Sequence, residues 1–331
     1  MLKELIPLYI KAPLGTVLKE YHYVPLKLLR LHALKVYADS RGFPQERKER
    51  IDYKLNTETH NYISEKYLGV LEPYTNNYYQ GTRPNEKCIW VFWWQGENKA
   101  PLIVKKCIDS IRRNAGNMIV KIIDSENYTE YVNVSDHIMM KMQKGIISLT
   151  HFSDYYRMAL LAKHGGLWID ASLFVKTEIP ACIFESPLFT VRNPGKDQTN
   201  ISQWNWTVGA IGGWSGNTLF CAVRDLLDRY WLENDYLIDY FIFDHMVRLV
   251  YETIDGVRNW ITEIPENNAD FYYLQDHLNH NADPIYDLYL SQNTWLYKVS
   301  WKGKYMEVTD DGRQTVYGKW LESIAGRGDK T

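Results

Sequence analysis

The clearest alternation of hydrophobic and polar positions lies in residues 148–164, where apolar side chains recur at three- and four-residue spacing. That spacing is typical of one buried helix face. We predict that Thr150 caps the helix and that Gly165 and Gly166 end it, because glycine tolerates the left-handed conformation that often follows a last turn. The chain should then reverse into a short apolar strand, residues 167–169, which delivers Asp170 to a sheet edge.

Upstream, residues 88–94 form an almost continuous aromatic and β-branched run, as expected of a strand covered on both faces. A helix is predicted over residues 101–113 and a second strand over 118–123, with Asp124 and Ser125 starting the next helix. Strand, helix and strand in this order indicate a parallel sheet of the α/β class. No Gly-x-Gly-x-x-Gly follows the first strand, which argues against a dinucleotide enzyme.

The remaining pattern divides the chain in two. Residues 1–84 are expected to form a helical N-terminal extension, with helices over 17–38, divided at Pro25, and over 45–67. Residues 85–331 are expected to form the α/β domain. Further strands are predicted over 187–192 and 206–213, further helices over 217–233, 239–251 and 313–325, and a loop over 72–87.

Composition excludes some classes of protein. A formal net charge of −2 argues against nucleic-acid binding. Cys88, Cys107, Cys182 and Cys221 lie far apart in apolar surroundings, which predicts reduced core thiols and favours the cytoplasm. No run approaches the roughly 20 apolar residues of a membrane span, and the N-terminus lacks the pattern of a signal peptide.

Residues 1–50 are locally basic, with ten Lys or Arg against five Asp or Glu. Two interpretations stay open. A basic amphipathic helix can lie on the inner face of an anionic membrane as a peripheral contact, or it can dock on its own domain. The basic residues concerned are Lys11, Lys19, Lys27, Arg30 and Lys35.

Asp154 and Arg157 are three residues apart, so they project from the same face of the predicted helix. An ordinary surface ion pair is the simplest interpretation. However, Asp170 follows one strand later, and ligands of open α/β sheets bind outside the carboxyl ends of strands. The spacing predicts that all three side chains meet at one end of the sheet.

Ser153-Asp154-x-x-Arg157 followed by Gly165-Gly166-Leu167-Trp168-Ile169-Asp170-Ala171-Ser172 resembles the core motif of the capsular polysaccharide synthesis proteins. More distant relatives of that family are yeast mannosyltransferases and the glucosylating clostridial toxins. The resemblance implies a GT-A (Rossmann-like) fold, a nucleotide-sugar donor of the UDP class, and Mn²⁺ or Mg²⁺. It implies that Asp154 and Arg157 hold the donor sugar and ribose, and that Asp170 opens the metal-binding Asp-x-Asp element. Its second Asp is replaced here by Ser172.

Three further segments resemble the same family. The segment Trp93-Trp94-Gln95-Gly96 corresponds to a family segment that faces the base of the nucleotide, which implies that Trp93 or Trp94 stacks on uracil. The alternative is that at least one of the two packs in the core. Lys298-Val-Ser-Trp301-Lys302 resembles the closing strand motif, which implies that Trp301 and Lys302 meet the donor. In the Asp239 to Asp244 run, we expect only one carboxylate to point into the site, because residues five apart do not share a helical face. Asp244 is a catalytic candidate together with Asp154, Arg157 and Asp170.

The resemblance therefore implies a retaining glycosyltransferase that extends a capsular or extracellular polysaccharide precursor, with a glycan acceptor that is lipid-linked. An inverting enzyme would instead need a general base, for which Asp239, Asp244, His151 and His245 are candidates. One alternative is a non-catalytic sugar- or nucleotide-binding component of a polysaccharide assembly complex, motivated by Ser172. A phosphosugar transferase is a second alternative.

Overall fold

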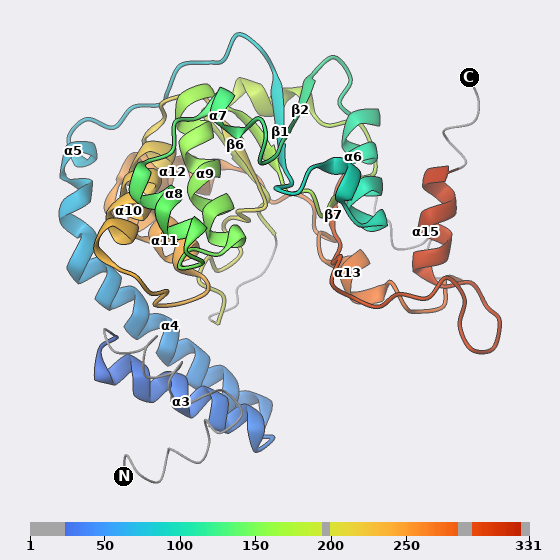
Figure 1. Cartoon of the computed structure of the whole chain (residues 1–331), viewed down its shortest axis with the longest axis horizontal. Helices are drawn as coiled ribbons and strands as arrows, with labels where there is room; N and C mark the ends of the chain where they lie inside the picture. The colour runs from blue at the N-terminus through green and yellow to red at the C-terminus, as the bar shows by residue number, and fades with distance from the viewer. Residues whose placement is uncertain (1–23, 194–198, 284–292, 326–331) are drawn as a thin grey trace.

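The computed structural model describes residues 24–193, 199–283 and 293–325 (Figure 1). The part of the predicted helix before Pro25, including Lys19, therefore lies largely outside the described residues, as does Lys11. So does the tail after residue 325.

A five-stranded sheet in the order β2-β1-β3-β6-β5 forms the centre of the fold. Its strands are β1 (Cys88–Phe92), β2 (Ile119–Ile123), β3 (Gly166–Ile169), β5 (Leu188–Thr190) and β6 (Ala210–Gly213). β1 runs parallel to β2 and β3, which confirms the α/β class, whereas β6 is antiparallel to both β3 and β5. The parallel pairing predicted from residues 88–123 is thus confirmed, while the directions of β5 and β6 were not predicted. Among the described residues that connect β5 to β6 there is no helix, and parallel strands need such a crossover.

Alternate side chains of the central strands enter two different cores. Trp90 and Trp168 pack on the face covered by α9 (Leu149–His164), α10 (Thr218–Glu233) and α11 (Ile242–Thr253). Ile89 and Leu167 pack on the other face, against α6 (Leu102–Arg113). Burial on both faces explains why β1 reads as a continuous apolar run.

The reversal between α9 and β3 is tightly packed. Gly165 has φ 64° and Gly166 φ 97°, so the predicted glycine turn is confirmed. A Cβ on Gly166 would lie 2.6 Å from the indole nitrogen of Trp90, which itself donates to the carbonyl of Gly165. The cap prediction was wrong by two residues, because the hydroxyl of Ser148, not Thr150, accepts the backbone N–H of His151.

Smaller elements surround the sheet. β4 (Leu173–Val175) and β7 (Leu296–Lys298) form a separate antiparallel pair. The other helices are α5 (Glu72–Thr75), α7 (Tyr128–Tyr131), α8 (Asp136–Gln143), α12 (Asp255–Glu263), α13 (Tyr273–His277) and α15 (Val316–Ala325), with 3₁₀ turns at Leu68–Leu71, Glu97–Lys99 and Ala181–Glu185.

The described N-terminal part is a helix pair, α3 (Leu26–Ser40) and α4 (Gln45–Tyr67), at the lower end of the molecule in Figure 1. α3 begins directly after Pro25, as expected of a residue that tolerates the first turn and no later one. Lys27 and Lys35 of α3 form ion pairs with Glu58 and Asp52 of α4. Throughout the described residues, every helix is too short or too polar to cross a bilayer.

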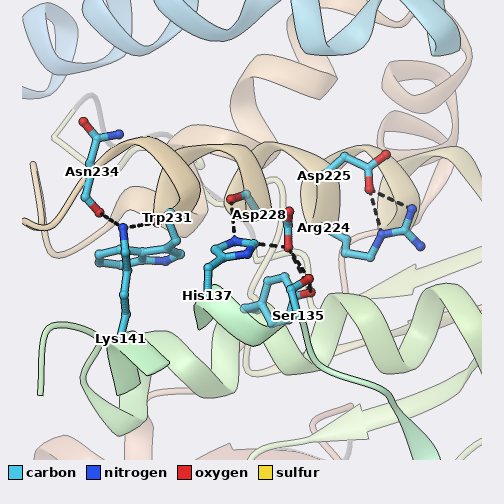
Figure 2. A network of polar contacts seen from close by, with 9 residues as sticks. Ser135, His137, Lys141, Arg224, Asp225, Asp228, Trp231 and Asn234 are labelled. Atoms are coloured by element: carbon cyan, nitrogen blue, oxygen red, sulfur yellow. Dashed lines mark hydrogen bonds and ion pairs between the residues drawn. The ribbon is translucent and has the colours of Figure 1, made fainter. Parts of the chain in front are cut away.

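A buried lysine joins α8 to the end of α10 (Figure 2). The ammonium of Lys141 donates to the carbonyls of Trp231 and Asn234, and it lies 2.8 Å from a carboxylate oxygen of Asp235. The last carbonyls of a helix have no intrahelical partner, so this contact satisfies them. It also fixes the start of the segment that runs from residue 234 to α11.

The prediction that all four cysteines lie in the core is only partly confirmed. Cys88 and Cys107 are buried, Cys221 is half-buried, and Cys182 is exposed. All four are free of disulfides, as expected. Cys182 lies in a 3₁₀ turn whose Ile183 and Phe184 take the buried positions.

Candidate active site

A cavity of about 1500 Å³ opens beyond the carboxyl ends of β1 and β3. Strand ends at a sheet edge leave such a crevice because the connecting segments turn away on either side. All ten site residues predicted from the sequence line it: Trp93, Trp94, Gln95, Asp154, Arg157, Asp170, Ser172, Asp244, Trp301 and Lys302. The structure therefore brings together residues as far apart in the sequence as Trp93 and Lys302. Their individual roles stay predictions.

Arg157 of α9 lies at the base of this cavity with only 4% of its side chain exposed. One Nη donates to the carbonyl of Val208 at 2.6 Å, and the other donates to Asp170 at 3.1 Å. The same nitrogen lies 3.5 Å from a carboxylate oxygen of Asp154. Burial excludes the interpretation as an ordinary surface ion pair, since exposed pairs are screened and contribute little.

Two aromatic rings complete the surroundings of the guanidinium. Its central carbon lies 4.9 Å from the ring centroid of Trp168 and 5.2 Å from that of Phe243, distances typical of cation–π contacts. Because Trp168 comes from β3 and Phe243 from α11, rings of two other elements contact this arginine of α9.

Asp170 is positioned by both its backbone and its side chain. Its N–H donates to the carbonyl of Gly209, and its Oδ1 accepts from the indole of Trp168 at 2.8 Å. A Cβ on Gly209 would lie 2.8 Å from Oδ2 of Asp170. The glycine before β6 is therefore needed for the approach of the Asp170 carboxylate.

Burial changes the acidity of the two carboxylates beside this cluster. Burial raises the pKa of Asp154 to about 7; Arg157 opposes the shift, and the charges of Asp170 and Asp244 add to it. Burial likewise raises the pKa of Asp244 to about 6, against the hydrogen bond from the Trp206 indole and the charge of Arg157. Near neutral pH both groups can carry or release a proton.

The structure contradicts our expectation that only one of Asp239 and Asp244 faces the site. Both line the cavity. α11 begins only at Ile242, so Asp239 precedes the helix, and the argument from helical faces does not apply to it. Its Oδ1 instead accepts the backbone N–H of Phe241 at 2.7 Å. By contrast, His151 and His245 are buried at 4% and 0% exposure and are not among the lining residues.

An aromatic and cationic group follows the ends of β1 and β7. Trp93 and Trp301 meet edge to face with ring centroids 5.5 Å apart, and the ammonium of Lys302 lies 5.6 Å from the Trp301 centroid. Trp94 packs on Tyr128 and Phe152, so core packing explains part of this residue. Trp301, with 41% exposure, is the more accessible ring for a flat ligand.

Asp170 and Ser172 are the candidate metal ligands, and both contact the same lysine. The ammonium of Lys298 lies 3.0 Å from the Ser172 hydroxyl and 3.7 Å from Oδ2 of Asp170. The two oxygens thus lie close to one cationic atom, and such ligands suit Mg²⁺ or Mn²⁺. Among the described residues, no group of three or more His, Cys, Asp or Glu could hold a metal. The residues fit a cation that takes most of its ligands from a bound substrate.

Sequence reasoning missed several lining residues. Trp206 was predicted only as the start of a strand, yet its indole donates to Asp244 at 3.0 Å. The individual lining residues of the N-terminal helices were not predicted either, namely His32, Lys35, Asp52, Leu55 and Asn56. Polar residues that recur three or four positions apart along these helices could have indicated that this face of the helix pair is not simply solvent-exposed.

The raised pKa of Asp154 predicts a pH-dependent effect of Asp154→Asn on stability. The folded state holds this proton more tightly than the unfolded chain, in which the pKa is about 4. Wild-type stability is therefore lost between about pH 4 and pH 7 as the unfolded chain ionises first. Because asparagine cannot ionise, the variant should be more stable than wild type at pH 8 by on the order of 4 kcal/mol, and much less so at pH 4.

Urea unfolding of both proteins at the two pH values measures this difference. A stability difference that is the same at pH 4 and pH 8, or a variant less stable at pH 8, would contradict the account of Asp154.

Comparison with known proteins gives similarities to a curated protein and to solved structures. Among curated proteins, "O-glycosyltransferase braB" of Annulohypoxylon truncatum is 29% identical over 100 residues, which cover 28% of this chain and 24% of that protein. The match thus spans about a quarter of that relative. The solved structure of the PaToxG glycosyltransferase has a TM-score of 0.38 at 14% identity, covering 69% of this chain and 86% of the other. The apo structure of the WbbM bifunctional glycosyltransferase has a TM-score of 0.40 at 13% identity, covering 72% and 50%.

The family comparison is more extensive than these. The model of the capsular polysaccharide synthesis protein family matches residues 41–320, which include α4, the whole five-stranded sheet and every predicted site residue. The resemblance predicted from the motifs is therefore confirmed: this chain belongs to the capsular polysaccharide synthesis protein family.

Proposed function

We propose that the protein is a glycosyltransferase that moves a sugar from a nucleotide-diphosphate donor of the UDP class to a capsular or extracellular polysaccharide precursor. The observation that carries the proposal is the cluster of Asp154, Arg157 and Asp170 at the base of the cavity, in a chain of the capsular family. The glycosyltransferase name of the curated relative supports the same reaction class.

In this proposal, the donor lies along the edge of the sheet. Trp93, Trp94 and Gln95 after β1 and Trp301 after β7 take the base and ribose, since flat rings can stack on a base while polar groups fix its edge. Lys298 and Lys302 face the diphosphate, where negative charge grows as the bond to the sugar breaks. Cations positioned for that charge stabilise the transition state more than the ground state.

Asp154 and Asp170 are proposed to accept hydrogen bonds from hydroxyls of the donor sugar, in an orientation that Arg157 maintains. Mn²⁺ or Mg²⁺, held by Asp170 and Ser172, would supply further positive charge to the leaving diphosphate. Both Nη atoms of Arg157 already donate hydrogen bonds within the protein, one to Val208 and one to Asp170. We therefore propose that it acts mainly by positioning the two carboxylates.

Retention of the anomeric configuration is proposed from family membership alone. If the reaction inverts, a general base must reach the acceptor hydroxyl. Burial away from the cavity argues against His151 and His245 for this role, whereas Asp239 and Asp244 line it. The raised pKa of Asp244, about 6, lies near the operating range of such a base.

We also propose the division into an N-terminal extension, residues 1–84, and a catalytic domain, residues 85–331, in a cytoplasmic protein. Buried free thiols at Cys88 and Cys107 support a reducing compartment. The ion pairs of Lys27 and Lys35 with α4 support docking of α3 rather than its adsorption to a membrane. A lipid-linked acceptor would then reach the cavity without an electrostatic contact between these two lysines and the membrane.

Incubation with a panel of UDP-, GDP- and dTDP-sugars, with and without Mn²⁺, tests the proposed function. We expect release of free nucleotide from UDP-sugars above the rate of an Asp170→Ala variant, because that variant lacks the strand-end carboxylate. Binding of a nucleotide sugar without turnover under every condition would instead favour a non-catalytic binding component. Release of a sugar phosphate would favour a phosphosugar transferase.

Lys298→Met tests the metal proposal without relying on turnover. In the nucleotide-free protein, the ammonium of Lys298 competes with a metal ion for Asp170 and Ser172. Removing this charge should tighten Mn²⁺ binding about tenfold in calorimetry, which corresponds to about 1.4 kcal/mol. Lys302→Met is the matched control and should leave the affinity within about twofold. Equal Mn²⁺ affinities of Lys298→Met and wild type would contradict this placement of the cation.

A further inference from the structure

The cavity is larger than the donor alone requires. Its volume of about 1500 Å³ exceeds the range of about 300–1,000 Å³ that is usual for small-ligand sites. The residues that are assigned to donor binding lie together at the ends of the strands. A second group of lining residues comes from α3, α4 and the segment before α11, and we call it the distal wall: His32, Lys35, Asp52, Asn56, Asp239, Tyr240 and Phe241.

Tyr240 and Phe241 are the exposed aromatic part of the distal wall. They are 59% and 52% exposed, and their rings meet edge to face at 5.2 Å. The Asp239 carboxylate accepts the N–H of Phe241, and the next two residues, Ile242 and Phe243, are buried. The turn is therefore fixed on both sides, while its two large rings remain exposed within the cavity.

Tyr240 packs edge to face on the buried ring of His151 at 5.5 Å. More than half of each side chain is nevertheless exposed, which loses the free energy that burial would supply. A flat ring can stack on the C–H face of a sugar, while the tyrosine hydroxyl still forms hydrogen bonds. Lys141 holds the start of the same segment at the end of α10 (Figure 2), and Nε2 of His151 lies 3.2 Å from the carbonyl oxygen of Tyr240.

The polar part of the distal wall holds one lysine and two carboxylic acids, Asp52 and Asp239. Lys35 and Asp52 form an ion pair at 2.7 Å, and the amide of Asn56 donates to the carbonyl of Thr199 at 2.7 Å. His32 lies beside Asp239, with its pKa lowered by burial. A wall of paired charges and amides offers hydrogen bonds to hydroxyl groups, and it has no excess of positive charge that would select a polyanion.

We propose that the distal wall is an acceptor subsite for a neutral oligosaccharide, in which Tyr240 and Phe241 stack on sugar rings and helices α3 and α4 form the outer side. The subsite deepens the proposed transferase function, because the nascent glycan would enter between the N-terminal helix pair and the sheet edge. The helix pair is then part of substrate binding.

Binding of neutral pentasaccharides of glucose, galactose, mannose and xylose, measured by saturation-transfer NMR and calorimetry, tests the subsite directly. The wild-type protein should bind at least one of them. The double variant Tyr240→Ala/Phe241→Ala should bind it about tenfold more weakly, as expected for the loss of stacking contacts. Tyr53→Ala, which removes a 48% exposed ring of α4 outside the cavity lining, should bind as wild type does.

A second double variant, Lys35→Met/Asp52→Asn, tests the side formed by α3 and α4 and should also weaken pentasaccharide binding. Binding of none of the pentasaccharides, or wild-type affinity in the Tyr240/Phe241 double variant, would overturn the subsite. Both results are independent of donor turnover. Pentasaccharide binding that depends on Tyr240 and Phe241, in a protein that turns over no nucleotide sugar, would instead support the subsite and refute the transferase.

Discussion

The burial of one positive charge, the guanidinium of Arg157, is the constraint on which the rest of the site depends. Removing a cation from water costs several kcal/mol unless hydrogen bonds and opposite charges replace the water. Here the replacement comes from the carbonyl of Val208, the carboxylate of Asp170 and the nearby carboxylate of Asp154. The arginine can be buried only while α9, the end of β3 and the approach to β6 keep their relative positions.

The same arrangement explains why the site is costly to maintain. Asp154 and Asp244 share the base of the cavity with one buried arginine, and burial raises the pKa of both carboxylates. A second cation, Lys298, approaches Asp170 from β7 and links the small sheet to the large one. Carboxylates held in this way are poised for a ligand that brings hydroxyls or a charged leaving group, at the expense of stability.

Much of this could be predicted from the sequence because the central motif is local. The helix, the glycine reversal and the strand before Asp170 follow one another within about twenty residues, and each has its own signal in periodicity or turn chemistry. The antiparallel strands could not be predicted in the same way, since their direction depends on connections between distant segments. The Asp239 error has a related cause: the helix start at Ile242 decides which faces exist, and start positions are weakly encoded. Likewise, the cavity wall from α3 and α4 depends on docking between elements, to which no single motif corresponds.

The central claim is that Arg157 acts through the carboxylate of Asp170 as one unit. A double-mutant cycle of Arg157→Lys and Asp170→Asn, measured as kcat/KM for the nucleotide sugar, tests it most directly. Lysine keeps the charge but not the planar pair of donors. The account predicts that kcat/KM of each single variant falls at least about tenfold. It predicts that kcat/KM of the double variant lies within about threefold of that of the less active single variant, because the effects of residues that act as a unit are non-additive. Losses that multiply in the double variant would contradict it.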